Sequence, residues 1–571
     1  MTISNQRSTI YNNNYFWLII SVIFAVYYGA VSCYYAFSQD YLVQDDARQH
    51  VVWLQRYIDS ELFPNDIIAD YFVNLAPLGY KSFYWLFARL GIEPIVLAKI
   101  LPTFLGLTTT IYIYWFSLAI IPLPSCAFLS SLFINQLMWL NDDLISATPR
   151  AFLYPLFAAF LYYLTQEKIS LCLLVMALQG LFYPQLLLIE ITILSFRLIE
   201  YYPIIKLTRK TQPYIWWILG LIVTAIALYP LTQKTPELAT VVTAPQMKQM
   251  PEFNLNGRSN FFGGSWLSYW FTGSSGLSLP WFPPIVWCGL ALPFILKKSL
   301  PTIKLIKPKI IILWQIVGAS LLMFVAAHIL LPKLHLPSRY TYHSLRFYLA
   351  IASAIVITTL LDLFKSWRKK IEYKNKLKLS QKITILLVNI FAATVILFPL
   401  IPPVFIGWFQ NWQVGKEREI YQYLAQQPKD IIVASLSPEV NNIPAFSQRS
   451  ILVGGEFALA YHPDYHHLIT QRTIALLQAQ YSNNLSDLQK FINEYKIDYI
   501  LIDKAAFTPE YLQQQNWLIY SSWQQTTRKI IAKLESGENS TIAHFILSCQ
   551  AVSTEKLILL DTNCIDKSSD L

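Results

Sequence analysis

Long apolar runs are the feature that most constrains this chain. Between Tyr15 and Trp408, stretches of about 20 mostly apolar residues recur, and this is the length at which an α-helix crosses a hydrocarbon core of about 30 Å. Only 14% of the 571 residues are charged, against about 25% in soluble domains. The runs therefore predict a polytopic α-helical membrane protein.

The same runs predict about eleven transmembrane helices. The first of them, Tyr15–Phe37, is longer and more aromatic than the apolar core of a secretory signal, so we expect it to be retained. The candidate spans are 15–37, 96–120, 125–140, 149–165, 169–183, 184–199, 213–232, 279–297, 309–332, 344–364 and 383–408.

Positive charge is concentrated in three short loops, at residues 206–210, 297–309 and 365–382. Lysine and arginine in short loops mark the cytoplasmic side of a membrane. A cytoplasmic N-terminus followed by alternating spans puts all three loops in the cytoplasm and the C-terminus outside. The net charge of +10 thus reflects the topology of the chain and does not predict a nucleic-acid partner. We expect the protein to lie in the bacterial plasma membrane.

The chain divides into two expected domains. Residues 1–410 are predicted to form the membrane domain, with external loops at 38–95 and 233–278. Residues 411–571 have the composition of a soluble domain, and alternating strand-like and helix-like segments predict an extracytoplasmic α/β domain with a largely parallel sheet. Strands are expected at Asp430–Ser435, Ile451–Val453 and Ile497–Ile502, and the alternation continues through Glu510–Gln515, Leu518–Tyr520, Gln524–Leu534 and Thr541–Leu547.

Two further expectations concern local structure. In the first external loop, Ala47–Tyr57 has apolar residues at helical spacing and is predicted to lie flat in the membrane interface, with Tyr80–Leu90 as a second interfacial or re-entrant helix. Cys549 and Cys564 could pair if the C-terminal domain faces an oxidising compartment.

Asp45 and Asp46 lie directly beyond the first predicted span, within Gln44–His50. Two adjacent carboxylates repel each other unless a cation, a metal or a proton offsets them. One interpretation is a general base that takes a proton from an acceptor hydroxyl, with or without a divalent cation. The other is an ordinary helix N-cap, for which aspartate is well suited.

A second acidic pair, Asp142 and Asp143, is predicted on the same membrane face and is followed by Arg150. The pair would either complete a metal site or form an ion pair with Arg150. The alternative is a solvated turn at a helix N-terminus, where the helix dipole favours aspartate.

Four arginines are candidates for a clamp on a phosphate, because guanidinium groups give bidentate hydrogen bonds to phosphate oxygens. Arg346 lies three residues into an apolar helix, which is costly unless it is paired or faces a cavity. The alternative for all of them is snorkelling to lipid headgroups. The four are Arg150, Arg258, Arg339 and Arg346.

Several other polar residues are candidates for substrate contact, and for each of them packing within a turn or loop is the alternative. Glu190 is an acid within a predicted span, which makes it a functional hypothesis by default, although its partner is not evident from the sequence. The candidates for substrate contact are His50, Tyr183, Gln185, Arg449 and His462.

This layout resembles the GT-C superfamily of polytopic membrane glycosyltransferases. The resemblance rests on the acidic pair of Gln44–His50 after the first span, the many spans and the C-terminal α/β domain. It implies a polyprenyl-phosphate-linked sugar donor, a glycan, lipid or protein acceptor, membrane lipids as neighbours, and Asp45 or Asp46 at the catalytic acidic position. It implies no certain cofactor, with a divalent cation on Asp45 and Asp46 as the one candidate. The aromatic sequon-binding motif of oligosaccharyltransferases is missing from the sequence.

Two other classes of function compete with this interpretation. A transporter or flippase of lipid-linked or polar solutes opens to both sides and usually shows inverted repeats. This sequence has no visible repeat, and its polar clusters gather on one predicted face. A non-catalytic membrane assembly protein would use the C-terminal domain for docking and would not need the carboxylates.

Overall fold

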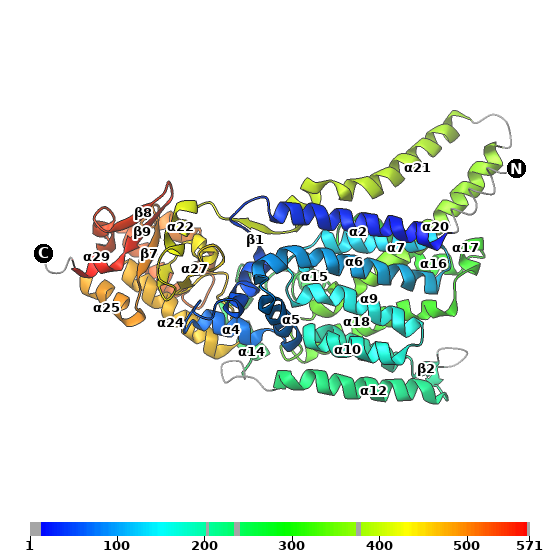
Figure 1. Ribbon diagram of the computed structural model, residues 1–571, viewed down its shortest axis with the longest axis horizontal. Helices are drawn as coiled ribbons and strands as arrows, with labels where there is room; N and C mark the ends of the chain where they lie inside the picture. The colour runs from blue at the N-terminus through cyan, green and yellow to red at the C-terminus, as the bar shows by residue number, and fades with distance from the viewer. Residues whose placement is uncertain (1–12, 201–204, 233–239, 373–377, 568–571) are drawn as a thin grey trace.

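The computed structural model describes residues 13–200, 205–232, 240–372 and 378–567. The molecule is elongated, with a bundle of long helices at one end and the C-terminal sheet and its helices at the other (Figure 1). Residues 233–239 of the predicted external loop and residues 373–377 of the third basic loop lie outside the described ranges.

Every predicted span overlaps a helix. Six helices in the described ranges are long and apolar enough to cross a membrane, so the count of eleven crossings stays a prediction. The helices of the bundle are α2 (Asn14–Ala36), α6 (Pro94–Ile120), α7 (Pro124–Trp139), α9 (Leu153–Thr165), α10 (Ile169–Phe182), α11 (Pro184–Phe196), α12 (Thr211–Leu228), η5 and α16 (Pro284–Ala291 and Leu292–Leu296), α18 (Ile311–Ile329), α20 (Ser344–Glu372) and α21 (Leu379–Leu397).

The short helix α7 decides where the second acidic pair lies. Its 16 residues give a length of about 24 Å, less than the hydrocarbon core of about 30 Å, and nearly all of its side chains are buried. The following turn, with α8 (Asp142–Ile145) and the 3₁₀-helix η2 (Pro149–Phe152), is therefore enclosed by protein. The side chain of Asp143 has no exposed surface.

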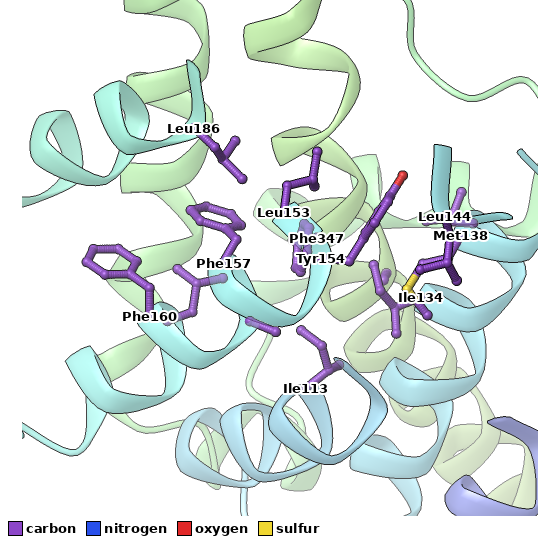
Figure 2. Close-up of a cluster of buried hydrophobic side chains, with 14 of the residues drawn as sticks. Ile113, Ile134, Met138, Leu144, Leu153, Tyr154, Phe157, Phe160, Leu186 and Phe347 are labelled. Carbon is purple, nitrogen blue, oxygen red and sulfur yellow. The ribbon is translucent and has the colours of Figure 1, made fainter. Parts of the chain in front are cut away.

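An apolar cluster directly supports this turn. Figure 2 shows side chains of α6, α7, α8, α9, α11 and α20 meeting in one place, among them Ile113, Met138, Leu144 and Phe347. Helices in a membrane associate mainly through van der Waals packing, and this cluster supplies such packing between them. Tyr154 belongs to the cluster and carries a hydroxyl at the tip of its ring, which links the apolar core to the polar site described below.

The basic loops lie at one end of the bundle. The hairpin of β2 (Ile199–Glu200) and β3 (Lys206–Leu207), the short helix α17 (Pro301–Lys304) and the far end of α20 are all at the end opposite the C-terminal sheet (Figure 1). The fold therefore separates the lysine-rich surface from the acidic pairs along the length of the helices.

The C-terminal region contains a five-stranded mixed sheet in the order β6-β5-β7-β9-β8. The expectation of a largely parallel sheet is wrong, because only β5, β6 and β7 run parallel and the hairpin of β8 and β9 joins them antiparallel. This hairpin was not predicted from the sequence. The strands are β5 (Ile432–Ser435), β6 (Ser450–Ile451), β7 (Tyr499–Asp503), β8 (Gln550–Ser553) and β9 (Leu557–Asp561).

Helices flank this sheet, and two segments at strand positions of the predicted alternation are helical instead. Leu518–Tyr520 falls on α27, and Thr541–Leu547 falls on a 3₁₀-helix. Cys549 and Cys564 form a disulfide at the edge of this region. The helices are α22 (Arg418–Ala425), η9 (Pro438–Asn442), α23 (Ile443–Phe446), α24 (Pro463–Gln480), α25 (Leu485–Tyr495), α26 (Pro509–Gln513), α27 (Asn516–Ile519), α28 (Gln524–Glu535), η10 (Thr541–Phe545) and α29 (Thr562–Lys567).

The first external loop is built into the junction between bundle and sheet. Strand β1 (Leu42–Gln44) pairs antiparallel with β4 (Trp412–Val414), which leads into the C-terminal region. Apolar side chains between Val52 and Phe72 share one buried cluster with those of the C-terminal sheet. The loop contains α3 (Asp45–His50), the 3₁₀-helix η1 (Val52–Tyr57), α4 (Ile67–Leu75) and α5 (Leu78–Arg89).

The expectation that Ala47–Tyr57 lies flat in the membrane interface is wrong. Val51, Val52, Trp53 and Leu54 have no exposed surface, because the bundle core contacts one side of this segment and the C-terminal core the other. Helix α5 fits its prediction better. It buries Tyr80 on one face and exposes apolar side chains such as Leu86 on the other.

The described part of the second long external loop is also ordered around a core of its own. Met247, Phe253 and Phe261 pack with Leu336 and Ala460 in a small buried cluster. The loop thereby contacts both the approach to α20 and the C-terminal region. Its elements are α14 (Ala244–Gln249), η4 (Pro251–Phe253) and α15 (Trp266–Phe271), and the segment before α20 contains α19 (Ser338–Tyr342).

Candidate functional site

The acidic pair of the first loop occupies the first turn of α3 without capping it. The side chain of Gln44 takes the N-cap role, because its Oε1 accepts a hydrogen bond from the Ala47 backbone N–H at 3.0 Å. The carboxylates of Asp45 and Asp46 are thereby free to pair with other groups. Asp45 lies 2.6 Å from the Arg48 guanidinium, and Asp46 forms an ion pair with Arg150.

Arg150 joins the two acidic pairs. One of its terminal nitrogens contacts Asp46, and the other lies 2.9 Å from Asp143. Burial acts to raise the pKa of Asp143, but Arg150, His343 and Arg346 outweigh it and hold this pKa well below its usual range. Asp143 is therefore a fixed negative charge inside the protein.

Arg346 completes the network from the first turns of α20. Its guanidinium lies 3.1 Å from Asp143 and donates a hydrogen bond to the Tyr154 hydroxyl at 2.6 Å. The same group stacks over the Tyr342 ring, 3.7 Å from its centre. Arg346 has no exposed surface, so the partners that offset its high cost within an apolar helix all lie inside the protein.

Asp142 faces the segment that leads to the C-terminal sheet. Its carboxylate accepts a hydrogen bond of 2.9 Å from the side-chain amide of Asn411. Burial raises the pKa of Asp142, and the neighbouring charge of Asp143 raises it further. The two members of this pair thus differ: Asp143 is held charged by arginines, whereas Asp142 binds a proton more readily.

A second group of ion pairs centres on Glu456, which was not among the candidates from the sequence. Glu456 lies 3.5 Å from Arg48 and forms an ion pair with Arg258. Its backbone carbonyl accepts a 2.7 Å hydrogen bond from Gln49. Burial raises the pKa of Glu456 to about 7, helped by Asp45 and opposed by Arg258. The one signal in the sequence is its place after Gly454 and Gly455, in the loop that follows β6.

The positive charges of three candidate arginines act on His50. Burial, and after it the charges of Arg150, Arg258 and Arg339, lower the pKa of His50 to about 3, so the imidazole is neutral. Burial and then Arg339 lower the pKa of His335 to about 3 in the same way.

Arg339 differs from the other three candidate arginines. It is half-buried, and among the residues that the structure describes it has no ion-pair or hydrogen-bond partner for its guanidinium. Arg150, Arg258 and Arg346 are all neutralised by carboxylates. Arg339 is therefore the guanidinium with free donors for an anion.

Two of the remaining candidates lie close to this site. The Tyr183 hydroxyl is 3.4 Å from Nε2 of His343, whose Nδ1 lies 3.8 Å from Asp143. His462 contacts the Tyr71 hydroxyl through Nδ1 at 2.8 Å, and its charge acts on His335. Both residues thus connect to the groups around Asp143 and Arg339.

Three candidates are not brought into these networks. The Arg449 guanidinium donates to backbone carbonyls, among them those of Ala425 and Gln427 at the end of α22, which is a structural role. Gln185 begins α11 with a buried side-chain oxygen that has no hydrogen-bond partner among the described residues. Glu190 is fully buried in the same helix, and within the same described part of the chain neither of its carboxyl oxygens has a hydrogen-bond partner.

The residues present do not fit a divalent cation. Within the described ranges no group of three histidine, cysteine, aspartate or glutamate side chains is arranged to hold a metal. Asp46 and Asp143 instead converge on the Arg150 guanidinium, which has the place that a bridging cation would need. A positively charged side chain supplies here the compensation that two neighbouring carboxylates require.

No family profile matches the chain, and no curated protein matches it. Among solved structures, it is similar to the oligosaccharyltransferase of Archaeoglobus fulgidus, with 12% identity, a TM-score of 0.49, and coverage of 90% of this chain and 72% of that one. The arabinofuranosyltransferase AftD from mycobacteria is similar with 11% identity, a TM-score of 0.44, and coverage of 85% and 36%.

Other structures of the archaeal enzyme, AglB, contain an inhibitory peptide with dolichol-phosphate, or Zn and sulfate. All of these TM-scores lie below 0.5.

Proposed function

We propose that this protein is an integral membrane glycosyltransferase that moves a sugar from a polyprenyl-phosphate-type lipid donor to an acceptor on the extracytoplasmic face. The observation that carries the proposal is the chain of ion pairs from Asp46 through Arg150 and Asp143 to Arg346, beside the half-buried Arg339 with its free donors. A carboxylate that can accept a proton thus lies among guanidinium groups suited to a departing phosphate.

Asp46 is the general base of this proposal. Its side chain is one-fifth exposed and belongs to the network that joins the first loop to α20, whereas Asp45 pairs with Arg48 towards the C-terminal region. As the acceptor hydroxyl attacks the anomeric carbon, its proton passes to Asp46 and the bond to the donor phosphate oxygen breaks with its electron pair. Direct displacement inverts the configuration at that carbon.

Arg339 binds the donor phosphate with its free donors, and Arg258, which is paired with Glu456, adds positive charge. The leaving group gains negative charge as the sugar departs, and fixed cations at that position lower the barrier more than they stabilise the intact donor. Arg346 is buried and acts as a positioning residue that holds Asp143, which in turn holds Arg150 and Asp46.

No step of this reaction passes through a metal. A Zn ion accompanies sulfate in one structure of the archaeal neighbour. In this chain the Arg150 guanidinium lies between Asp46 and Asp143, and we propose that it takes the part of a bridging cation.

The site faces the extracytoplasmic side, and residues 411–571 form a domain on that side. The disulfide Cys549–Cys564 supports this, because such bonds persist in oxidising compartments. The lysine-rich loops at the opposite end of the bundle support it as well (Figure 1). Reporter tags in the first loop and beyond Trp408 test the topology: both should report the same external compartment, and opposite compartments would refute it.

Turnover by the reconstituted wild-type protein tests the activity. Proteoliposomes supplied with polyprenyl-phosphate pentoses and hexoses and with soluble glycan acceptors should release free polyprenyl phosphate. Movement of intact donor across the bilayer without cleavage of the sugar–phosphate bond would instead identify a flippase, the main competing function.

A further inference from the structure

A groove of about 490 Å³ opens on the outer side of the molecule, between the second long external loop and helix α24. Ligand-binding clefts of small molecules have volumes of roughly 300–1,000 Å³, so the groove has room for a ligand of a few rings. One wall comes from α14 and the residues around it, including Gln246, Gln249 and Met250. The other comes from the first turns of α24, including Pro463 and His467.

The lining of this groove combines apolar surface with polar groups and contains none of the strongly charged residues. None of the described side chains that line it is lysine, arginine, aspartate or glutamate. Its hydrogen-bonding groups are amides, imidazoles and hydroxyls, from Gln246, Gln249, His467 and Ser522, and they alternate with apolar surface from Met250 and Pro463. Such a lining suits a ligand with many hydroxyl groups and apolar C–H faces, and it suits a phosphate poorly.

Several of these polar groups are unused within the protein. Across the described ranges, the side chains of Gln249 and His467 have no hydrogen-bond partner, and the Gln246 side chain accepts bonds from Thr243 with its oxygen while its amide NH₂ donates to none. Three side chains in one groove thus present donors and acceptors to a bound molecule.

The floor of the groove is rigid. Glu252 is buried and accepts a 2.6 Å hydrogen bond from the Ser522 backbone N–H, and its carboxylate lies 3.1 Å from Nε2 of His466. The His466 side chain is itself buried and lines the groove. These contacts join η4 to α24 and to the loop before α28, so the two walls keep their spacing.

The groove lies next to the proposed reaction site. Val242 lines the groove, and its backbone N–H donates a 3.1 Å hydrogen bond to the Tyr461 carbonyl. The Tyr461 ring lies against His335, and its hydroxyl is in the electrostatic field of Arg339 and Arg258. The segment Tyr461–Pro463, at most ~7 Å long between its end Cα atoms, thus connects the groove to a tyrosine on which both arginines act.

We propose that this groove binds saccharide units of the acceptor, so that the substrate that receives the sugar is a glycan chain. This inference rests on the proposed function and names its acceptor. A chain anchored at Gln249 and His467 can extend past Tyr461 and present its terminal hydroxyl to Asp46. A peptide acceptor is disfavoured, because a peptide with charged termini or side chains finds no counter-charge in the described lining.

Binding measured without donor separates this proposal from the catalytic one. The full chain in detergent is applied to an array of soluble gluco-, manno-, galacto- and arabino-oligosaccharides together with a set of unglycosylated peptides. The wild-type protein should bind at least one oligosaccharide class, and the double variant Gln249→Leu/His467→Leu should lose at least about 10-fold in affinity, because two groups lose their hydrogen bonds.

Matched controls show whether a loss of glycan binding is specific to the groove. Gln514→Leu/His544→Leu removes the same two residue types from exposed positions of the C-terminal region that do not line the groove, and it should bind as the wild type does. Glycan binding needs neither donor nor turnover, so a failed reaction mechanism would leave this result intact. Binding to none of the oligosaccharides, equal binding by the groove variant, or preferential binding of peptides would overturn the proposal.

Discussion

Asp46 and Asp143 share a single guanidinium, that of Arg150, although they lie in different loops of the chain. Asp143 has no exposed surface, whereas about a fifth of the Asp46 side chain is exposed. The buried carboxylate therefore fixes Arg150, and Arg150 fixes the more exposed carboxylate of Asp46. In the proposed reaction, Asp143 accordingly has the supporting role and Asp46 the chemical one.

Removing Arg150 should create a site for a divalent cation. Arg150→Gln leaves Asp46, Asp142 and Asp143 without their common positive charge, and hard carboxylate oxygens favour Mn²⁺. We expect Mn²⁺ to raise the melting temperature of this variant, with a stabilisation of about 2.7 kcal/mol at 100 times its Kd. The wild-type melting temperature should not respond to Mn²⁺.

Lys429→Gln is the matched control for this experiment. It also frees two carboxylates, those of Asp59 and Glu61, but at an exposed ion pair. Mn²⁺ should leave its melting temperature unchanged. Stabilisation of the wild-type protein by Mn²⁺ would contradict the view that Arg150 takes the place of a metal.

Replacing Arg339 by alanine should reduce phosphate affinity, whereas replacing Arg346 by alanine should reduce the stability of the fold. Arg339 has free donors, so Arg339→Ala should keep the wild-type melting temperature and lose roughly 10- to 100-fold in affinity for polyprenyl phosphate, the energy of charge-assisted hydrogen bonds. Arg346→Ala should destabilise the fold by about 3–5 kcal/mol, because it leaves Asp143 buried without one of its partners.

Thermal unfolding and binding of polyprenyl phosphate, measured on the same samples, separate these two outcomes. Lys365→Ala, at an exposed ion pair of α20, controls for the loss of one positive charge. Unchanged phosphate affinity in Arg339→Ala would count against the clamp. An undisturbed melting temperature in Arg346→Ala would show that the buried network is not structural.

Glu456 should make stability depend on pH. Its folded pKa of about 7 lies above the ordinary value of 4.5, so the folded state binds the proton that the unfolded state has lost. Stability should therefore fall as pH rises from about 4.5 to about 7, by at most about 3 kcal/mol. The groups that face Glu456 are Arg258, Asp45, Arg48 and Asp46, and their charges set the size of the effect.

The comparison of wild type with Glu456→Gln isolates this effect. The glutamine variant keeps the shape of the side chain but cannot ionise, so its melting temperature should decline less over this pH range. Parallel profiles for the two proteins would show that Glu456 does not titrate there.

The helices of the bundle could be predicted from the sequence because a membrane-spanning helix needs a continuous run of apolar residues. The length and apolar composition of a run such as 15–37 predict a membrane-spanning helix directly, and α2 occupies almost the same residues. The same reasoning failed for Ala47–Tyr57, since its apolar residues face protein on both sides, and composition does not distinguish a protein surface from a lipid surface.

The sheet and the site depend on contacts between distant residues, which local patterns do not contain. The antiparallel strand β9 lies beside β7 only because the chain folds back after α28, and nothing in Leu557–Asp561 specifies that neighbour. Arg346 could be suspected from its cost in an apolar helix and Asp143 from its place in an acidic pair, but the two could not be recognised as partners. Glu456 has a common residue type and an inconspicuous place, so its role is visible only once Arg48 and Arg258 lie beside it.

The rates of donor turnover by Asp46→Asn and Asp45→Asn in proteoliposomes test the central claim most directly. Asp46→Asn should slow the release of polyprenyl phosphate by about 10²- to 10⁴-fold, the usual contribution of a positioned base, with unchanged donor affinity. Asp45→Asn should cost less than about 10-fold, because it weakens a partly exposed ion pair with Arg48 and leaves the proton acceptor in place. Wild-type turnover by Asp46→Asn would contradict the account.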